Sequence, residues 1–433
     1  MALPKIKQDL TDAILAGPLP EGGSWLTAAR EAARGRVATM GLPIRRDEYW
    51  KFTNPEPWTG ALSHDTATEV AHLFDAVTPL TLVFTDGVFD AEASDERAAE
   101  GVTIELLSEV GHTDLHWAKG LYGALEGAAN GATRRDGARL FKPVERPMAA
   151  LNTAMAAEGV LIHATGEVSR PIRISYRSGG GDVMLHHLVK VEEGASLTLL
   201  EEGLPGARSN TMIEADIADR GTLHHLRIQG PEQERATLTN FYARTGEEST
   251  LKTFGFTANG AATRNEAVLD ITGDNATAHI AGGCLGDGAR GAFHHDDTVF
   301  ITHDAVNCES RQVYKKVLRN GATGVFQGKI LVQPDAQKTD GYQISQSLLL
   351  DEDAQFLAKP ELEIYADDVA CSHGSTTGAI DEQALFYLRS RGVPRKEAED
   401  LLTLSFLAEA IEEIEDEDLA AIVLAQIEDW LRA

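Results

Sequence analysis

Short apolar runs separated by polar turns fill the chain from Val160 to Val369. Clear examples are Leu161–His163, Ile172–Tyr176, Leu185–Val191 and Leu197–Leu200. These runs have the length and the aliphatic, β-branched composition of strands, and Gly, Asp and Asn stand between them. The pattern shows no helical crossovers between the runs, which argues against a doubly wound α/β sheet.

A weak internal repeat runs through the same section. The repeat units begin at Ser196-Leu197, Thr222-Leu223, Thr250-Leu251 and Thr277-Ala278. Their starts lie about 26 to 28 residues apart, a period that suits the coils of a solenoid. The sequence therefore predicts a mainly β protein whose core, residues 151–380, is a right-handed parallel β-helix.

The section before this core has a helical pattern. One helix is expected from Ser24 to Gly41, with Trp25, Ala29, Ala33 and Val37 among the residues on its apolar face. A second helix is expected over Met148–Ala157, and short strands are expected at Leu80–Phe84 and Val102–Leu106. Residues 1–150 are therefore predicted to form a mostly helical N-terminal region.

Residues 381–433 predict a helical C-terminal region. Asp381 is the expected N-cap of its first helix, and Gly392 and Pro394 follow the end of that helix. Two amphipathic helices follow, with apolar faces that include Leu401, Leu404, Leu407, Ile411 and Ile414 in one and Leu419, Ile422, Val423, Ile427 and Trp430 in the other. Such helices either cap the solenoid or present a surface to a partner, and the pattern favours neither.

A thiol and an imidazole stand between the predicted core and these helices. Glu361–Tyr365 alternates like a half-buried strand, and Asp367–Gly378 is expected to be a polar turn that carries Cys371 and His373. Both side-chain types bind soft metals and iron–sulfur clusters, and with one residue between them they face the same side of an extended segment. Two donors cannot complete a tetrahedral site, so metal binding requires donors from elsewhere. The alternative is a buried free cysteine beside a histidine bonded to the backbone.

Other candidate ligands carry weaker signals. Cys284 and Cys308 lack CxxC spacing and are expected to be core residues, with no role assigned. Three adjacent histidine pairs, at 186–187, 224–225 and 294–295, lie on predicted strands, where neighbouring side chains point to opposite faces. His112 and His116 would share a face if helical, but no third ligand is signalled nearby.

Two further patterns bear on enzymatic activity. Gly321–Ile330 resembles a phosphate loop but lacks its spacing and its hydroxyl residue, so no ATP site is expected. The pairs Asp296-Asp297 and Asp367-Asp368 raise a distant alternative, a β-helix enzyme that cleaves polysaccharides. Adjacent residues on a strand point apart, so neither pair is a good acid–base couple.

The composition narrows the classes of partner and location. With 39 basic and 67 acidic residues, the formal net charge of −28 argues against nucleic acid and anionic membranes as partners. The first residues lack the apolar core of a signal peptide, and no apolar run is long enough to span a membrane. Three distant cysteines suggest no disulfide framework, so a cytoplasmic location is expected.

A set of ordered motifs resembles the SufB/SufD family of iron–sulfur cluster assembly scaffolds. The motifs are Gly41-Leu42-Pro43, Arg45-Arg46-Asp47-Glu48, Trp50-Lys51, Phe326-Gln327-Gly328-Lys329-Ile330, Ala336-Gln337-Lys338-Thr339-Asp340, Lys359-Pro360-Glu361-Leu362-Glu363, Asp367-Asp368-Val369, Cys371-Ser372-His373-Gly374 and Leu385-Phe386-Tyr387-Leu388. The resemblance covers most of the chain and is thinnest between about residues 60 and 145. The small number of cysteines and the Cys-Ser-His segment favour the SufD branch over the paralogous SufB branch.

The resemblance implies a non-catalytic scaffold subunit with a β-helix core. It implies pairing with SufB through that core, docking of the SufC ATPase through the C-terminal helices, and a nascent iron–sulfur cluster at the SufB interface. It assigns the cluster to His373 first and to Cys371 with a smaller contribution. A homodimer is the alternative assembly when the chain is alone, and a reduced flavin is a further candidate ligand of the complex.

Overall fold

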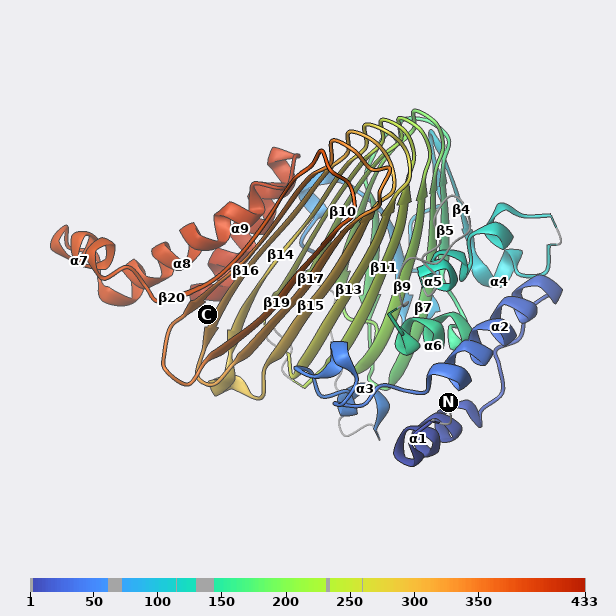
Figure 1. Cartoon of the computed structure of the whole chain (residues 1–433), viewed down its shortest axis with the longest axis horizontal. Coiled ribbons are helices and arrows are strands. Elements are labelled where there is room, and N and C mark those ends of the chain that lie inside the picture. Colours follow the sequence, from blue (N-terminus) through green and yellow to red (C-terminus); the bar gives the residue numbers. More distant parts are fainter. Residues whose placement is uncertain are drawn as a thin grey trace.

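The computed structural model describes residues 3–60, 72–113, 115–129, 144–230, 234–258 and 260–432. Its centre is a parallel β-solenoid built from two ten-stranded sheets that face each other (Figure 1). Sheet 1 has the order β2-β1-β6-β8-β10-β12-β14-β16-β18-β20, and sheet 2 has the order β19-β17-β15-β13-β11-β9-β7-β5-β4-β3. This architecture confirms the predicted mainly β class and the parallel β-helix core.

The strands are mostly eight to eleven residues long within the solenoid. Those of sheet 1 are β1 (Leu80–Thr85), β2 (Val88–Phe89), β6 (Ile172–Arg177), β8 (Ser196–Gly203), β10 (Thr222–Gln229), β12 (Thr250–Ala258), β14 (Thr277–Asp287), β16 (Glu309–Arg319), β18 (Asp340–Leu349) and β20 (Ala370–Gly378). Those of sheet 2 are β3 (Ala98–Ala99), β4 (Val102–Leu106), β5 (Val160–Ala164), β7 (Asp182–Val191), β9 (Arg208–Ile217), β11 (Ala236–Thr245), β13 (Ala262–Ile271), β15 (His294–His303), β17 (Thr323–Val332) and β19 (Gln355–Ile364).

The predicted repeat marks the first residue of one strand in each coil. Ser196, Thr222, Thr250 and Thr277 are register neighbours on β8, β10, β12 and β14. Neighbours in a parallel ladder carry their side chains on the same face, so equivalent positions of successive coils form continuous rows. The inward rows supply the aliphatic and aromatic core between the sheets, for example Leu223, Leu251 and Ala278.

The N-terminal helices cover the outer face of sheet 2. They are α1 (Lys5–Leu15), α2 (Ser24–Met40), α3 (Glu56–Thr59), α4 (Leu107–Val110), α5 (Ala124–Ala129) and α6 (Pro147–Met155), with the 3₁₀ turns η1 (Glu48–Trp50) and η3 (Trp117–Gly120) among them. A further 3₁₀ turn, η2 (Asp75–Val77), packs against sheet 1 instead. Helix α2 ends where it was predicted to end, because Gly41 adopts the left-handed φ of +67° there. The strands expected at Leu80–Phe84 and Val102–Leu106 are β1 and β4, and the helix expected at Met148–Ala157 is α6.

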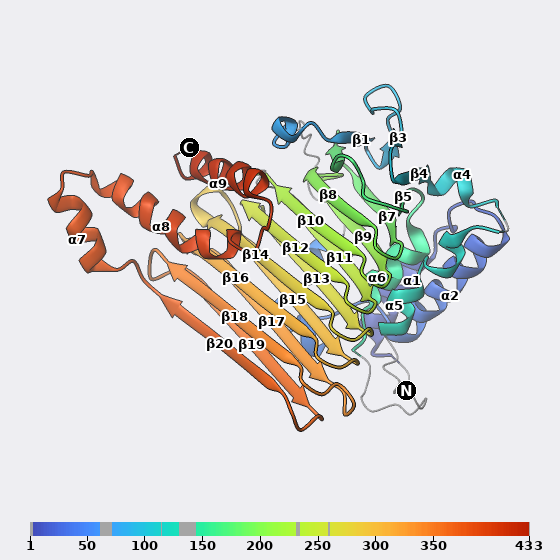
Figure 2. The same ribbon diagram turned by 90° about the horizontal axis from the view of Figure 1, so that it is seen from above.

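The C-terminal helices are α7 (Glu382–Ser390), α8 (Arg395–Ile411) and α9 (Glu417–Arg432). Asp381 caps α7 as predicted, since its carboxylate accepts hydrogen bonds from the backbone N–H groups of Gln383 and Ala384. Apolar residues of α8 and α9 pack against the outer face of sheet 1, where they meet Leu226, Phe254 and Val313. The helices therefore cover a side of the solenoid and do not cap its end (Figure 2).

The two ends of the solenoid differ. At the first end, β2 pairs antiparallel with β1 and β4 pairs antiparallel with β5, so short antiparallel elements terminate both sheets. At the other end, β20 is the last strand of sheet 1 and β19 is the last strand of sheet 2. In the part of the chain that the structure describes, no helix is long and apolar enough to cross a membrane.

Candidate functional site

The end of the solenoid formed by β19 and β20, called the open end below, contains two of the sequence motifs: Lys359–Glu363 on β19 and Cys371–Gly374 on β20. Strand β19 pairs with β17 and strand β20 pairs with β18, and within the described ranges neither has a strand on its other edge. All residues of both strands are exposed or half-buried, whereas eight of the ten residues of β17 and five of the ten residues of β18 are buried. Unpaired strand edges of this length are templates for pairing with another chain.

Cys371 and His373 lie on β20, so the prediction that Asp367–Gly378 is a turn is wrong from Ala370 onward and holds only for the bend at Asp367 and Asp368. Its polar residues and glycines suggested a turn, but β18 supplies a full parallel ladder that pairs Gly341 with Cys371 and Gln343 with His373. Tertiary hydrogen bonding therefore overrides the local preference. The expectation that the two side chains share one face is confirmed, because one residue separates them on a strand.

The shared face of Cys371 and His373 is the inner face of the solenoid. Cys371 packs with Ile330 and Leu362 at the end of the core. Its sulfur occupies the space that a side chain on Gly341 would need, since a Cβ there would lie 3.2 Å from Sγ. Partial burial raises the pKa of the Cys371 thiol above its ordinary value. The thiol therefore needs a metal or another cation nearby before it becomes a thiolate ligand.

His373 is exposed at the last rung of an inner row. Within the described ranges, no hydrogen bond or ion pair of its ring is found, and no group of three or more potential metal ligands is present. Cys371 and His373 thus provide two donors, and further donors would have to come from another molecule. The donor set is suited to a site shared across an interface, and the open end is where such an interface can form.

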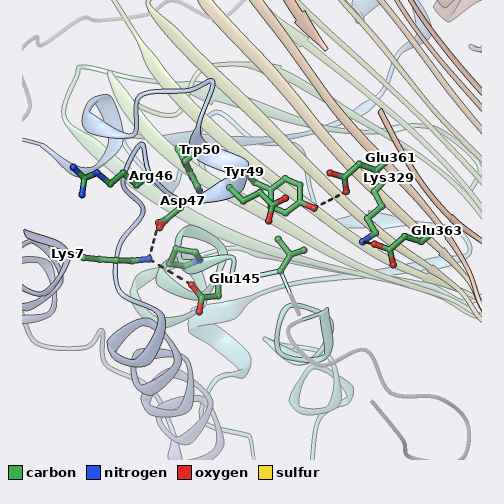
Figure 3. A pocket seen from close by; sticks show the side chains of 12 residues that line it. Lys7, Arg46, Asp47, Tyr49, Trp50, Glu145, Lys329, Glu361 and Glu363 are labelled. Atoms are coloured by element: carbon green, nitrogen blue, oxygen red, sulfur yellow. Dashed lines mark hydrogen bonds and ion pairs between the residues drawn. The ribbon is translucent and has the colours of Figure 1, made fainter. Parts of the chain in front are cut away.

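A segment of the N-terminal region braces the open end from outside (Figure 3). Tyr49 Oη donates a hydrogen bond of 3.0 Å to Glu361 on β19, and the Tyr49 ring lies 4.2 Å below the ammonium of Lys359. Lys359 also lies 3.0 Å from Glu48. The motif Arg45–Lys51, which the sequence left without a structural role, therefore fastens the edge strand β19 to the body of the protein.

A polar pocket of about 660 Å³ lies next to this brace. Its charged side chains largely pair with one another, as Lys7 does with Asp47 at 2.9 Å and Lys329 with Glu363 at 2.5 Å (Figure 3). Lys329 lies on strand β17, so the Gly321–Ile330 segment forms no phosphate loop. Because the lining charges are paired, the pocket is suited to fastening the N-terminal region to the sheet.

The turn between α8 and α9 is held by a row of cationic and titratable side chains on the outer face of sheet 1. The row consists of His224, Lys252, His279 and Arg311, which are register neighbours on four successive coils. Glu415 lies 2.9 Å from Lys252 and 3.2 Å from His224. Glu413 lies 3.0 Å from His279 and 3.3 Å from Arg311. The acidic turn therefore packs on a row of two imidazoles, one ammonium and one guanidinium.

The remaining candidate ligands have structural surroundings. Cys284 and Cys308 are buried in the core, and burial raises the pKa of Cys284 to about 12. The adjacent histidines lie on strands and point apart; His186 contacts Glu214, whereas His187 contacts Tyr176. His112 follows α4 and His116 precedes η3, so they do not share a helix face.

The paired aspartates are also accounted for. Asp296 faces the N-terminal region, where Thr53 donates a 2.5 Å hydrogen bond to it, and Asp297 faces the core, 2.5 Å from Lys316. Both carboxylates are buried. They point to opposite faces as predicted, and neither serves as an accessible acid–base pair. Asp367 and Asp368 precede β20, and the backbone N–H of Asp368 donates to Gln337.

Two functional elements were missed from the sequence. Gln343 on β18 is the ladder neighbour of His373, and the row of basic side chains under the α8–α9 turn joins residues up to 87 positions apart by register. Part of the signal for the row was present in the repeat, because His224, Lys252 and His279 each lie two positions after a predicted start of a coil. Only the ladder pairing shows that these positions are neighbours.

Comparisons with known proteins agree with the fold and the motifs. Residues 175–406 match the family described as "SUF system FeS cluster assembly, SufBD core domain". The chain is 29% identical over 401 residues to iron–sulfur cluster assembly protein SufD of Escherichia coli, with 90% of each chain covered. It is 26% identical over 294 residues to SufD of Bacillus subtilis, which covers 66% of this chain and 67% of that one. A SufBD family protein of Synechocystis is 26% identical over 419 residues, with 90% of this chain and 88% of that protein covered. With a matching core, a parallel β-solenoid and the ordered motifs at its open end, the chain belongs to the SufBD family of the SUF iron–sulfur cluster assembly system.

Proposed function

We propose that this protein is the SufD-type scaffold subunit of an iron–sulfur cluster assembly complex and has no catalytic activity of its own. The observation that carries the proposal is the open end of the solenoid. There the exposed imidazole of His373 and the thiol of Cys371 lie beside the outer edges of β19 and β20, which pair with no further strand of the described chain. In this proposal residues 151–380 form the pairing core, residues 381–433 form the ATPase-docking region, and residues 1–150 support the core.

The partner at the open end is SufB. A paralogue with a related β-helix can extend both sheets, since β19 and β20 offer free backbone groups along their outer edges. Ile364, at the end of β19, is 40% exposed and adds apolar area to the same end. The opposite end terminates in antiparallel strands, which favours a single pairing end. A homodimer through the same end is the alternative when SufB is absent.

The partner at the C-terminal helices is the SufC ATPase. Phe386 and Tyr387 on α7 are 74% and 55% exposed, and Leu401 on α8 is 44% exposed. Helix α7 projects from the solenoid and rests on α8 (Figure 2). Large apolar side chains this exposed on a projecting helix are typical of a protein-binding surface. ATP-driven movement of SufC would act on the solenoid through α8 and α9, which are packed on sheet 1.

The cargo of the complex is a nascent iron–sulfur cluster at the SufB interface. His373 offers an exposed ring nitrogen and Cys371 offers a sulfur donor, and the partner would complete the ligand set. A reduced flavin is a candidate ligand of the whole complex, and we assign it no residues of this chain.

Co-expression with SufB and SufC, followed by iron and sulfide analysis of the purified complex, tests this function. His373→Ala is expected to leave the complex intact and to lower the iron recovered with it, and Cys371→Ala should have a smaller effect. Ser375→Ala is the matched control, since Ser375 faces inward two residues further along β20 and bonds Ser345. An intact His373→Ala complex with undiminished iron and sulfide would make His373 a structural residue.

A further inference from the structure

The inner row that ends at His373 contains two glutamines. Gln312 on β16, Gln343 on β18 and His373 on β20 are register neighbours in successive coils. The Gln343 amide Nε2 donates a hydrogen bond of 2.9 Å to Gln312 Oε1. Both glutamine side chains are fully buried, which is unusual for this residue type and indicates a specific polar role.

Two buried side-chain atoms of this row, Gln312 Nε2 and Gln343 Oε1, lack a hydrogen-bond partner among the residues that the structure describes, and Gln343 Oε1 is the one next to the open end. Leaving such an acceptor unsatisfied is unfavourable, because burial removes the water that would otherwise donate to it. The next residue in the row is His373, about 4.8 Å away along the ladder, and its ring carries an N–H that can donate.

A glycine of the Phe326–Ile330 motif holds Gln343 in this place. A Cβ on Gly328 would lie 2.3 Å from Gln343 Nε2, so only glycine leaves room for the amide at this point of β17. Gly328 on β17 is the ladder neighbour of Pro360 on β19, just as Gln343 on β18 is the ladder neighbour of His373 on β20. Three of the family-like motifs therefore meet in the layer that contains Gln343 and His373.

We propose that Gln343 is a positioning residue for His373: its Oε1 accepts a hydrogen bond from one ring N–H and so leaves the other ring nitrogen as the donor that faces the partner. This inference rests on the proposed role of His373 and deepens it. A neutral imidazole has one N–H and one lone-pair nitrogen, so an acceptor on one side selects the tautomer and the orientation of the ring. Histidines that bind metals commonly donate their other N–H to such an acceptor.

The tautomer of His373 in the full-length chain tests the inference without any cluster. Long-range ¹H–¹⁵N spectra of histidine-labelled protein at pH 8 report the tautomer, and the signal that disappears in His373→Ala identifies the residue. The parent should show one neutral tautomer. Gln343→Leu, which has no acceptor, should convert it to a mixture of the two tautomers. Gln343→Asn, whose amide is one methylene shorter, should do the same and replaces the leucine variant if that variant does not fold.

Ser345→Ala is the control, because it removes a hydrogen bond between the same two strands and leaves Gln343 and His373 in place. It should keep the parental tautomer. An unchanged single tautomer in folded Gln343→Leu or Gln343→Asn would overturn the inference.

The iron content of the co-expressed complex separates this result from the proposed function. A change in iron with His373→Ala alone would support the function and leave Gln343 without a positioning role. A tautomer that responds to Gln343, together with iron that does not respond to His373→Ala, would retain the hydrogen bond and overturn the proposed role of His373 in cluster assembly.

Discussion

The carboxylate of Glu413, in the turn between α8 and α9, lies 3.0 Å from Nδ1 of His279 on β14. This contact joins the C-terminal helices to the middle of sheet 1. Arg311 approaches the same carboxylate on one side, and Glu309 lies 3.1 Å from the other nitrogen of His279. The helices proposed to bind the ATPase are thus tied to the solenoid by charge as well as by apolar packing.

The contact between the α8–α9 turn and sheet 1 should weaken in acid. The pKa of Glu413 is lowered, chiefly by its hydrogen bond with His279, and the pKa of His224 is lowered by burial. A group whose pKa is lower in the folded state stabilises that state fully above its ordinary pKa and loses the effect as the pH falls. The loss should begin with His224 below about pH 6.5 and continue with Glu413 in the carboxyl range.

Glu413→Gln should therefore lower the free energy of unfolding by about 1 kcal/mol at pH 7 and make little difference near pH 3. Urea unfolding at several pH values measures this. Glu412→Gln is the control, because Glu412 is an exposed neighbour. An equal loss of stability in the control would show that the contact with His279 contributes nothing specific.

Substitution of exposed apolar residues should show that SufC and SufB bind to different surfaces of the protein. Phe386→Ser with Tyr387→Ser should lower SufC recovery in pull-down experiments by tenfold or more and leave the melting temperature nearly unchanged, since both side chains are more than half exposed. Ile364→Asp, at the end of β19, should instead weaken SufB binding. Loss of both partners with either change would point to a general folding defect.

The brace on β19 should be measurable without any partner. Tyr49→Phe removes the hydrogen bond to Glu361 and keeps the ring that packs 5.0 Å from Phe300. The change should cost about 1 kcal/mol and speed hydrogen exchange along β19 more than along β15. Tyr387→Phe, a change at an exposed tyrosine, should alter neither. Equal hydrogen exchange along β19 in the parent and in Tyr49→Phe would show that the Tyr49 hydrogen bond does not hold β19 in place.

The three cysteines should differ in reactivity. Cys284 and Cys308 are buried, whereas Cys371 is half-buried at the open end. In the native chain iodoacetamide should modify Cys371 first, and the other two thiols should react only after unfolding. Mass spectrometry of the labelled peptides measures the order. Bound SufB should slow the labelling of Cys371, and fast native labelling of Cys284 would contradict the packing of the core.

Much of the fold could be predicted from the sequence, because a solenoid repeats one local pattern. The starts at Ser196, Thr222, Thr250 and Thr277 predicted the coils, and the structure places them in one row. Helix ends were predictable where a single residue determines the backbone, as Asp381 does through its cap and Gly41 through its positive φ.

Which strands pair, and in which register, was decided by the tertiary structure alone. The polar segment from Asp367 to Gly378 has the composition of a turn, and β20 forms there only because β18 offers it a ladder. In the same way, Gln343 comes to lie beneath His373, and His279 beneath Glu413, through register and packing between distant segments. Side-chain type and local spacing are properties of the sequence, whereas the neighbours of a residue across a ladder depend on where each coil turns, and that is determined by the packing of the whole solenoid.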